Sequence, residues 1–214
     1  MAKNWVVTKD QFLTKDEITR LYKSLLDAKD LAIQRGRFHC HIRDYYLFRL
    51  LLETGLRVFE LVALKVSDFH DGCLIIQNGK GGKRRNILLT KGTQKMIVEF
   101  IRVKRRTLGE PTDPTAPLLI SKRGRPYTTR GIRKRVKHWF SRLGFNRSLS
   151  VHSCRHSYVS HMIAAGVDLV TVRDNAGHSS LAVTSIYSHS VKGDLGDLEL
   201  FNSNSSTSAN KRNN

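Results

Sequence analysis

Apolar residues at helical spacing run through most of this 214-residue chain, and a stretch near its middle breaks the pattern. Between Cys73 and Thr90, two short apolar runs flank the segment Asn78-Gly79-Lys80-Gly81-Gly82-Lys83. Such a break is typical of a β-hairpin, here with lysines at its tip. The apolar run 118–120 is a candidate further strand. The chain is therefore predicted to be mainly α with a small antiparallel hairpin or sheet, an α+β fold.

Start and stop signals place helices on both sides of this hairpin. Thr14 and Glu17 have the spacing of a capping box, and Thr128 or Thr129 and Asp168 can cap later helices. Glycines that can end a helix follow four of the apolar stripes, at Gly55, Gly144, Gly166 and Gly177. The expected helices cover about residues 14–26, 45–54, 57–64, 96–101, 128–143, 151–165 and 168–175.

Basic charge is in large excess and unevenly distributed. The chain has 37 Lys and Arg residues against 18 Asp and Glu, a formal net charge of +19, so a polyanion such as nucleic acid is the obvious partner. Residues 114–167 include eleven Lys or Arg residues and no carboxylate. A run of this length favours a surface that docks on nucleic acid over an ordinary solvated face.

The helix expected to begin at Thr128 or Thr129 carries part of this charge. Apolar residues form one stripe of this helix, and its other face carries Arg130, Arg133, Lys134, Arg135 and Lys137. An amphipathic helix with a basic outer side suits the DNA backbone or a groove. With two residues of the hairpin added, the expected DNA-binding set is Lys83, Arg84, Arg130, Arg133, Lys134 and Lys137.

Cysteine usage and hydropathy bear on metal binding and on the cell compartment. Cys40, Cys73 and Cys154 are odd in number and far apart, so neither a disulfide framework nor a zinc ribbon is expected. We expect no metal site and no cofactor. No apolar run suited to a signal peptide follows Met1, and no stretch of eighteen apolar residues occurs. The expectation is a soluble cytoplasmic protein, associated with the nucleoid and not with a membrane.

Several residues in the second half of the chain can act on a phosphate diester. Tyr187 can attack phosphorus, Arg155 can grip two nonbridging oxygens through its planar fork, and imidazoles can move a proton. His152 and Arg155 lie at i and i+3 of one expected helix, so both can face one phosphate, whereas Arg57 must arrive from elsewhere in the fold. In-line attack adds negative charge to the nonbridging oxygens, which fixed positive donors stabilise. These groups are suited to cutting DNA or RNA through a covalent phosphotyrosine.

Five short motifs, in this order and at this spacing, resemble those of the tyrosine recombinases, also called phage-integrase-type or Xer-type site-specific recombinases. The matching segments are Thr54-Gly55-Leu56-Arg57-Val58-Phe59-Glu60-Leu61, Gly79-Lys80-Gly81-Gly82-Lys83-Arg84, His152-Ser153-Cys154-Arg155-His156, Gly177-His178-Ser179 and Ile186-Tyr187-Ser188-His189. The resemblance covers most of the chain. It implies the fold of the family's catalytic domain.

The resemblance also implies a role for each matched residue. Tyr187 would be the nucleophile, and Arg57 and Arg155 would hold the scissile phosphate. His152 would assist proton transfer, and His178 would donate a hydrogen bond to the phosphate.

The remaining matched residues carry one open choice and two departures from the family pattern. Glu60 would be a supporting carboxylate, and Lys80 would be the general acid, with Lys83 as the competitor for that role. Phe59 stands where the family commonly has a small residue, and Ala176 stands where a leucine is usual. Local packing could therefore differ at these two positions.

The resemblance further implies how the chain is organised. Residues 1–191 would form the recombinase catalytic domain, and no separate N-terminal core-binding domain is evident before Thr54. Residues 192–214 would form a docking segment, around the apolar cluster from Leu195 to Phe201, and a disordered tail rich in Ser and Asn. Both a single-domain recombinase and a truncated integrase fit this arrangement.

The activity that the resemblance implies is site-specific DNA recombination through a 3′-phosphotyrosine, without metal or ATP. The partners would be double-stranded DNA and further copies of the chain in a homotetramer on DNA, with an accessory protein as an option. Two alternatives stay open: relaxation of single duplexes, as by a type IB topoisomerase, and a non-catalytic DNA-binding regulator with the same fold. The motifs leave open the choice among integration, excision, inversion and resolution.

Overall fold

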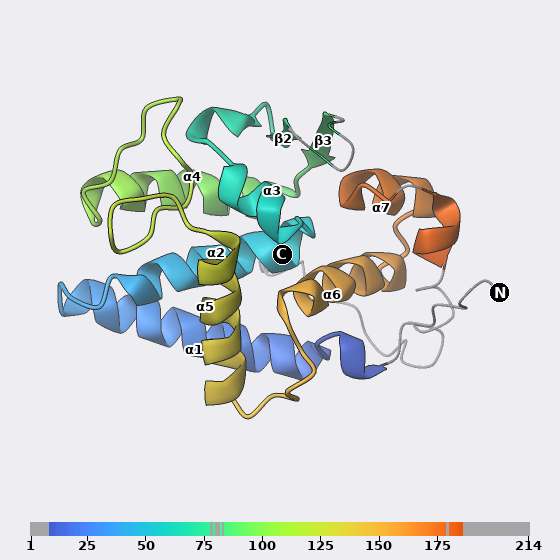
Figure 1. Ribbon diagram of the computed structural model, residues 1–214, viewed down its shortest axis with the longest axis horizontal. Coiled ribbons are helices and arrows are strands. Elements are labelled where there is room, and N and C mark those ends of the chain that lie inside the picture. The colour runs from blue at the N-terminus through green and yellow to red at the C-terminus, as the bar shows by residue number, and fades with distance from the viewer. Residues whose placement is uncertain (1–8, 78, 80–81, 83, 179, 186–214) are drawn as a thin grey trace, which may run out of the picture.

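The structure, a computed structural model, describes residues 9–77, 79, 82, 84–178 and 180–185 (Figure 1). The α-helices are α1 (Lys15–Gln34), α2 (Cys40–Thr54), α3 (Val58–Ala63), α4 (Lys91–Arg106), α5 (Thr129–Arg142), α6 (Val151–Ala164) and α7 (Leu169–Ala176), and residues 181–185 are also helical. The other elements are the 3-10 helices η1 (Lys9–Gln11) and η2 (Val66–Asp68) and the strands β1 (Phe69–His70), β2 (Cys73–Ile76) and β3 (Arg85–Leu88). The predicted mainly α fold with a small antiparallel sheet is confirmed.

The helix ends follow the local signals of the sequence. Thr14 forms the predicted capping box of α1, and Asp168 caps α7 through its side chain. Of the two threonines proposed for α5, Thr128 is the cap. Gly55 and Gly177 end α2 and α7 in the left-handed conformation, with φ of 61° and 66°. A predicted site residue follows each of these two glycines within two positions, so the helix ends help to place the site.

The sheet has three antiparallel strands in the order β1-β2-β3. The predicted hairpin is present, with Leu74 opposite Ile87 in the register of β2 and β3. The two-residue strand β1 was not predicted. The strand proposed at 118–120 is wrong, because this region forms isolated bridges, between Lys65 and Pro117 and between Ile120 and Pro126. Proline has no backbone N–H to continue a ladder, so the run stays a buried, irregular segment.

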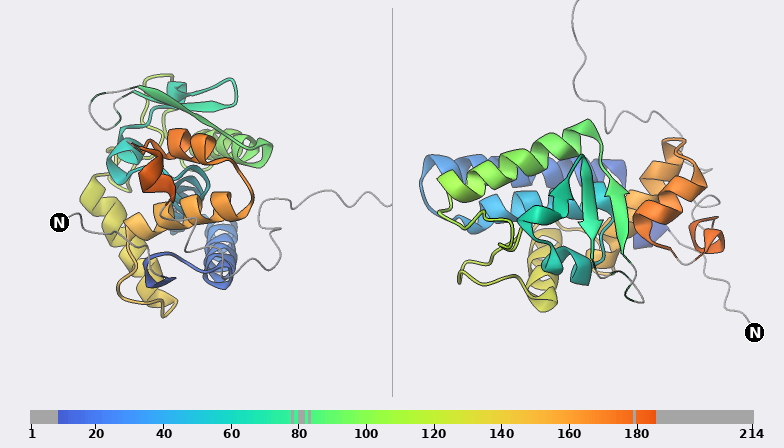
Figure 2. Two further views of the ribbon diagram at one scale, coloured as in Figure 1. Left: turned by 90° about the vertical axis from the view of Figure 1, so that its right-hand side faces the viewer. Right: turned by 90° about the horizontal axis from the view of Figure 1, so that it is seen from above.

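Helix α2 is the centre of the core. Its side chains are buried around most of its circumference, among them Leu47, Phe48, Leu50 and Leu51, and the buried Arg43 and Asp44 have partners on other elements. Helices α1, α4 and α6 pack against it (Figure 1). In the left-hand view of Figure 2, α6 and α7 lie between the small sheet and α1. No helix in the described part of the chain is long and apolar enough to span a bilayer.

Candidate active site

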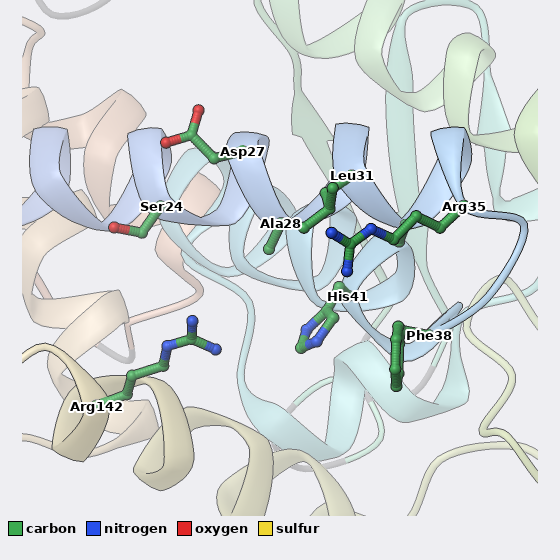
Figure 3. Close-up of a pocket in the computed structure, with 9 residues that line it drawn as sticks. Ser24, Asp27, Ala28, Leu31, Arg35, Phe38, His41 and Arg142 are labelled. Atoms are coloured by element: carbon green, nitrogen blue, oxygen red, sulfur yellow. The ribbon is translucent and has the colours of Figure 1, made fainter.

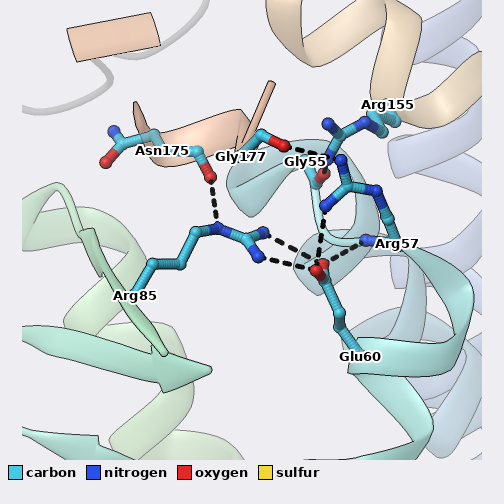
Figure 4. A network of polar contacts seen from close by, with 7 residues as sticks. All are labelled: Gly55, Arg57, Glu60, Arg85, Arg155, Asn175 and Gly177. Atoms are coloured by element: carbon cyan, nitrogen blue, oxygen red, sulfur yellow. Dashed lines mark hydrogen bonds and ion pairs between the residues drawn. The ribbon is translucent and has the colours of Figure 1, made fainter. Parts of the chain in front are cut away.

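Three arginines from distant parts of the chain meet at one place (Figure 4). Arg57 caps the N-terminus of α3, Arg85 begins β3, and Arg155 lies on α6. The carboxylate of Glu60, on α3, is bonded to two of them. The cluster therefore has three cationic side chains around one buried anionic side chain, an arrangement suited to binding a further anion.

Arg57 is held in place by its own helix and by the end of α7. Its backbone N–H donates to Glu60 Oε2 at 2.8 Å, and its Nη1 donates to Glu60 Oε1 at 3.1 Å. Its Nη2 donates to the carbonyl oxygen of Gly177 at 2.6 Å. These contacts use two of the five N–H donors of the guanidinium. The side chain is thus oriented, and its contacts with the described residues leave further N–H donors for a ligand.

Arg155 is bound to the end of α2. It is 8% exposed, and its Nη1 donates to the carbonyl oxygen of Gly55 at 2.7 Å. Gly55 has to be a glycine here, because a Cβ atom would lie 2.3 Å from a ring carbon of Tyr158 and φ is positive. The glycine of the first motif therefore lets α6 approach closely enough for Arg155 to reach its carbonyl.

Three histidines lie within electrostatic reach of the arginines, and the pKa of each is lowered. Burial, followed by the charges of Arg155 and Arg57, lowers the pKa of His178 to about 3. Burial, followed by His152 and Arg155, lowers the pKa of His156 to about 4. The side chain of His152 is exposed, and partial desolvation, followed by Arg133 and Arg155, also lowers its pKa. Neutral imidazoles can accept a proton or donate a hydrogen bond without adding charge to the site.

His178 is fixed from both sides. It follows the C-terminal end of α7, where its backbone N–H donates to the carbonyl oxygen of Arg173 at 3.0 Å. Its Nδ1 lies 3.0 Å from Thr184 Oγ1, a hydrogen bond whose direction depends on the tautomer. The structure therefore brings together Arg57, Glu60, Arg155 and His178, and it places His152 on the first turn of α6. The catalytic roles expected for these residues stay predictions.

Arg85 belongs to this site and was missed from the sequence. Its Nη1 donates to Glu60 Oε1 at 2.6 Å, and its Nη2 donates to Glu60 Oε2 at 3.0 Å. The strand pattern gave a usable signal, because Arg85 alternates with exposed residues and shares its face with the buried Ile87. The hairpin motif as read from the sequence ended one residue earlier, at Arg84, whose side chain is exposed.

Three of the predicted catalytic or DNA-binding residues lie outside the described part of the chain. These are Lys80 and Lys83 in the hairpin loop and Tyr187. The segment 192–214, predicted to dock and to include a disordered tail, also lies outside it. Their roles stay predictions.

The basic face expected on α5 is present with one correction. Arg130, Arg133, Lys134 and Lys137 are exposed and lie at i, i+3, i+4 and i+7, which places them on one stripe. After burial, the charge of Arg133 is the next cause that lowers the pKa of His152, so the stripe acts electrostatically on this histidine.

Arg135 was wrongly placed on this outer face. Its Nε donates to Asp44 Oδ1 at 2.8 Å, and Trp139 Nε1 donates to Asp44 Oδ2 at 2.9 Å. Asp44 is fully buried on α2, so it needs a counter-charge from the facing helix. Arg135 supplies it and is thereby turned inward.

A separate hollow of about 410 Å³ lies between α1 and the C-terminal end of α5 (Figure 3). Its lining includes Asp27, Leu31, Arg35, Phe38 and Arg142, and none of the predicted site residues. Among the described residues, no group of three or more His, Cys, Asp or Glu side chains could hold a metal ion.

Comparisons with known proteins identify the family of the chain. The model of the phage integrase family matches residues 11–193. The tyrosine recombinase XerC of Lactobacillus leichmannii is 32% identical over 181 residues, which are 84% of this chain and 58% of the relative. The tyrosine recombinase XerD of Oceanobacillus iheyensis is 30% identical over 187 residues, 87% of this chain and 60% of the relative. The chain thus spans less than two thirds of the length of these relatives.

Solved structures share the fold. The crystal structure of XerA recombinase matches with a TM-score of 0.67 and 26% identity, over 83% of this chain and 60% of that one. A post-cleavage complex of XerH site-specific recombinase with palindromic difH substrate matches with a TM-score of 0.67 and 25% identity, over 90% of this chain and 52% of that one. The chain therefore belongs to the phage integrase family, and its fold is that of the catalytic domain of the tyrosine recombinases.

Proposed function

We propose that this chain is a site-specific DNA recombinase that cuts and rejoins strands through a covalent 3′-phosphotyrosine, with Tyr187 as the nucleophile. The observation that carries the proposal is the convergence of Arg57 and Arg155, from α3 and α6, beside His178. Two arginines that face one position can hold the nonbridging oxygens of a phosphate and stabilise the charge that develops there. Membership of the phage integrase family supports the reaction class.

The proposed cleavage is an in-line displacement at phosphorus. The hydroxyl oxygen of Tyr187 attacks the phosphorus, the bond to the 5′ oxygen breaks, and the phosphate becomes attached to the tyrosine. The neutral imidazole of His152 takes the tyrosine proton, and Lys80, or its competitor Lys83, gives a proton to the 5′ oxygen. His178 donates a hydrogen bond to the phosphate. Attack by a 5′ hydroxyl reverses these steps and rejoins a strand. The phosphotyrosine ester keeps the energy of the broken phosphodiester bond, so the proposed reaction needs neither ATP nor metal.

DNA would be bound over the basic stripe of α5 and the hairpin. The exposed Arg130, Arg133, Lys134 and Lys137 would contact phosphates, with Lys83 and Arg84 beside them. The XerH structure is a complex with its difH substrate, which supports double-stranded DNA as the partner. Strand exchange needs two duplexes, so we propose a homotetramer on DNA, with residues 1–191 as the catalytic domain and residues 192–214 as the docking segment and tail. The protein would act in the cytoplasm, on the nucleoid, with or without an accessory protein.

The test is formation of a covalent adduct. The protein is incubated in EDTA with labelled duplexes from both flanks of its own gene, and adducts that resist SDS are separated on a gel. We expect an adduct with the native protein and with Tyr127→Phe as the matched control, and none with Tyr187→Phe. An adduct that persists in Tyr187→Phe would overturn the assignment of the nucleophile.

A second assay separates the reaction classes. Two duplex sites of different length are mixed with the protein, and a relaxation assay on supercoiled plasmid runs in parallel. Recombinant products of new length indicate a recombinase. Relaxation without exchange indicates an activity of the type IB topoisomerase kind, and specific binding with neither product indicates a DNA-binding regulator.

A further inference from the structure

Glu60 is the most heavily bonded side chain of the arginine cluster. Its carboxylate is fully buried and accepts four hydrogen bonds, two from Arg57 and two from Arg85. The two bonds from Arg85 come from its two terminal nitrogens, one to each oxygen, at 2.6 and 3.0 Å. This is the bidentate fork, the strongest geometry between an arginine and a carboxylate.

The share of Arg57 in this contact is different. One bond comes from its backbone N–H, and its guanidinium donates a single longer bond of 3.1 Å. The guanidinium also donates to the Gly177 carbonyl oxygen, so it is not turned wholly toward the carboxylate. Arg85 is therefore the main counter-ion of Glu60, and the positive charge of Arg57 is only partly offset.

The ionisation of Glu60 agrees with this division. Burial by itself would raise the pKa of the carboxyl, but the hydrogen bond from Arg85 and then the backbone N–H of Arg57 outweigh it, and the pKa is lowered. The carboxylate is thus charged at neutral pH. A buried charge of this kind needs a full counter-charge close by.

We propose that Arg85 is a positioning residue that neutralises Glu60, so that the positive charge of Arg57 stays available to an incoming phosphate. The inference rests on the proposed function, because it assigns Arg85 a part in the same phosphate site. Without Arg85, the buried carboxylate would be left to Arg57 as its guanidinium partner. The net charge facing the phosphate would then fall although both phosphate-binding arginines remain.

Arg85 also links the hairpin to the end of α7. Its Nε donates to the carbonyl oxygen of Asn175 at 3.4 Å, and the backbone N–H of Leu88 donates to Asn175 Oδ1 at 3.3 Å. A Cβ atom at Gly177 would lie 2.8 Å from Arg85 Cζ, so the guanidinium packs directly on this backbone. His178 is the next residue. The same side chain therefore sets the distance between β3 and the helix end that carries His178.

Charge variants separate neutralisation from simple anchoring. Arg85→Gln keeps a polar side chain but leaves Glu60 with Arg57. We expect cleavage about tenfold to a hundredfold slower, by analogy with the hydrogen-bonding partners that orient the ligands of a metal site. Arg85→Lys keeps the charge but loses the fork, so its cleavage rate should lie between those of the native protein and Arg85→Gln. A double variant combines Arg85→Gln with Glu60→Gln, so the carboxylate that lost its main counter-ion is replaced by a neutral amide. This double variant should cleave about tenfold faster than Arg85→Gln alone, a coupling usual for residues in contact.

The experiment measures the first-order rate of covalent adduct formation at saturating protein on a nicked duplex of the target site. Melting temperature and DNA affinity are measured on the same samples, and Arg105→Gln, which removes an exposed charge on α4, is the matched control and should behave as the native protein. Anchoring alone predicts that the double variant is as slow as Arg85→Gln or slower, and that result would overturn the inference. A cleavage rate in Arg85→Gln equal to that of the native protein would also overturn the inference. The proposed function would still stand in that case, because the native protein forms the adduct.

A second measurement does not depend on cleavage. Titration with inorganic phosphate, followed by nuclear magnetic resonance of the arginine side-chain N–H groups, reports the charge of the site directly. We expect weaker phosphate binding in Arg85→Gln and recovery in the double variant. If no DNA gives an adduct with the native protein, the proposed function fails, and this titration decides the role of Arg85 by itself. Equal phosphate binding by the native protein, Arg85→Gln and the double variant would overturn the role proposed for Arg85.

Discussion

Glu60 and Glu110 are both buried carboxylates with two cationic partners, but their surroundings differ. Glu110 accepts hydrogen bonds from Arg43 Nε at 2.7 Å and from Lys104 Nζ at 2.9 Å. Lys104 is fully buried, so no ligand can reach its ammonium group. This cluster ties α2, α4 and the loop after α4 together.

The cluster around Glu60 has a further cation and is more open. Arg155 adds a third positive charge, and the side chains of Arg57 and Arg85 keep 17% and 14% of their surface exposed. Backbone carbonyls at the ends of α2 and α7 orient the arginines without neutralising them. In this protein, the enclosed cluster around Glu110 therefore serves the stability of the fold, whereas the cluster around Glu60 keeps excess positive charge that a ligand can reach.

The largest expected effect comes from breaking the enclosed cluster. Glu110→Gln leaves Lys104 and Arg43 buried without their counter-charge, which should lower the free energy of unfolding by about 3–5 kcal/mol. Urea denaturation monitored by circular dichroism measures it. Replacing Lys104 by Met in the same variant should restore part of the loss. An unchanged denaturation midpoint in Glu110→Gln would show that the cluster contributes nothing to stability.

Arg57→Lys and Arg155→Lys test the open cluster. Lysine keeps the charge but cannot form the fork, so cleavage should slow by about a hundredfold to a thousandfold while the fold stays intact. The adduct assay gives the rate, and a melting curve checks the fold. Arg43→Lys, in the enclosed cluster, is the matched control and should leave cleavage unchanged below its melting temperature. Full cleavage by both site variants would mean that these arginines do not hold the phosphate.

Single changes on the α5 stripe should have a smaller effect. Arg130→Ala or Lys134→Ala removes one phosphate contact, so the slope of log affinity against log salt should fall by about 0.9. Fluorescence anisotropy with a labelled duplex between about 50 and 200 mM salt measures the slope. Arg105→Ala, on the exposed side of α4, is the control. Equal slopes in all three variants would place the DNA elsewhere.

Near neutral pH, protonation should have a smaller effect still. The pKa of His178 is lowered to about 3, first by burial and then by Arg155 and Arg57, so its imidazole should stay neutral where a free histidine, of pKa about 6.5, already titrates. Because the unfolded chain binds this proton first, His178 makes the fold less stable as pH falls below about 6.5. Nuclear magnetic resonance of the imidazole C–H gives the pKa. Arg57→Gln should raise it, and a titration near 6.5 in the native protein would contradict this assignment.

Much of the fold could be predicted because its signals are local. The capping box at Thr14, the cap at Asp168 and the left-handed glycines after α2 and α7 act within a few residues of themselves. The hairpin could also be predicted from a local signal, the two short apolar runs on either side of a segment rich in Gly and Lys. The strand predicted at 118–120 is wrong because an apolar run shows only that a segment is buried. Whether the segment pairs with a neighbouring strand depends on the segments packed around it, and here only isolated bridges form.

Short-range spacing was enough to predict the helices and the hairpin, and ordered motifs named Arg57, Glu60, Arg155 and His178 as candidate site residues. The pairing of charges depends on contacts between residues far apart in the chain. Arg135 and Asp44 are 91 residues apart, Arg57 and the Gly177 carbonyl are 120 apart, and Arg155 and the Gly55 carbonyl are 100 apart. An arginine looks the same in a sequence whether it faces water, a buried carboxylate or a phosphate. Its partner is set by the packing of whole helices, because a buried charge must be neutralised by the nearest cation in space and not in the chain.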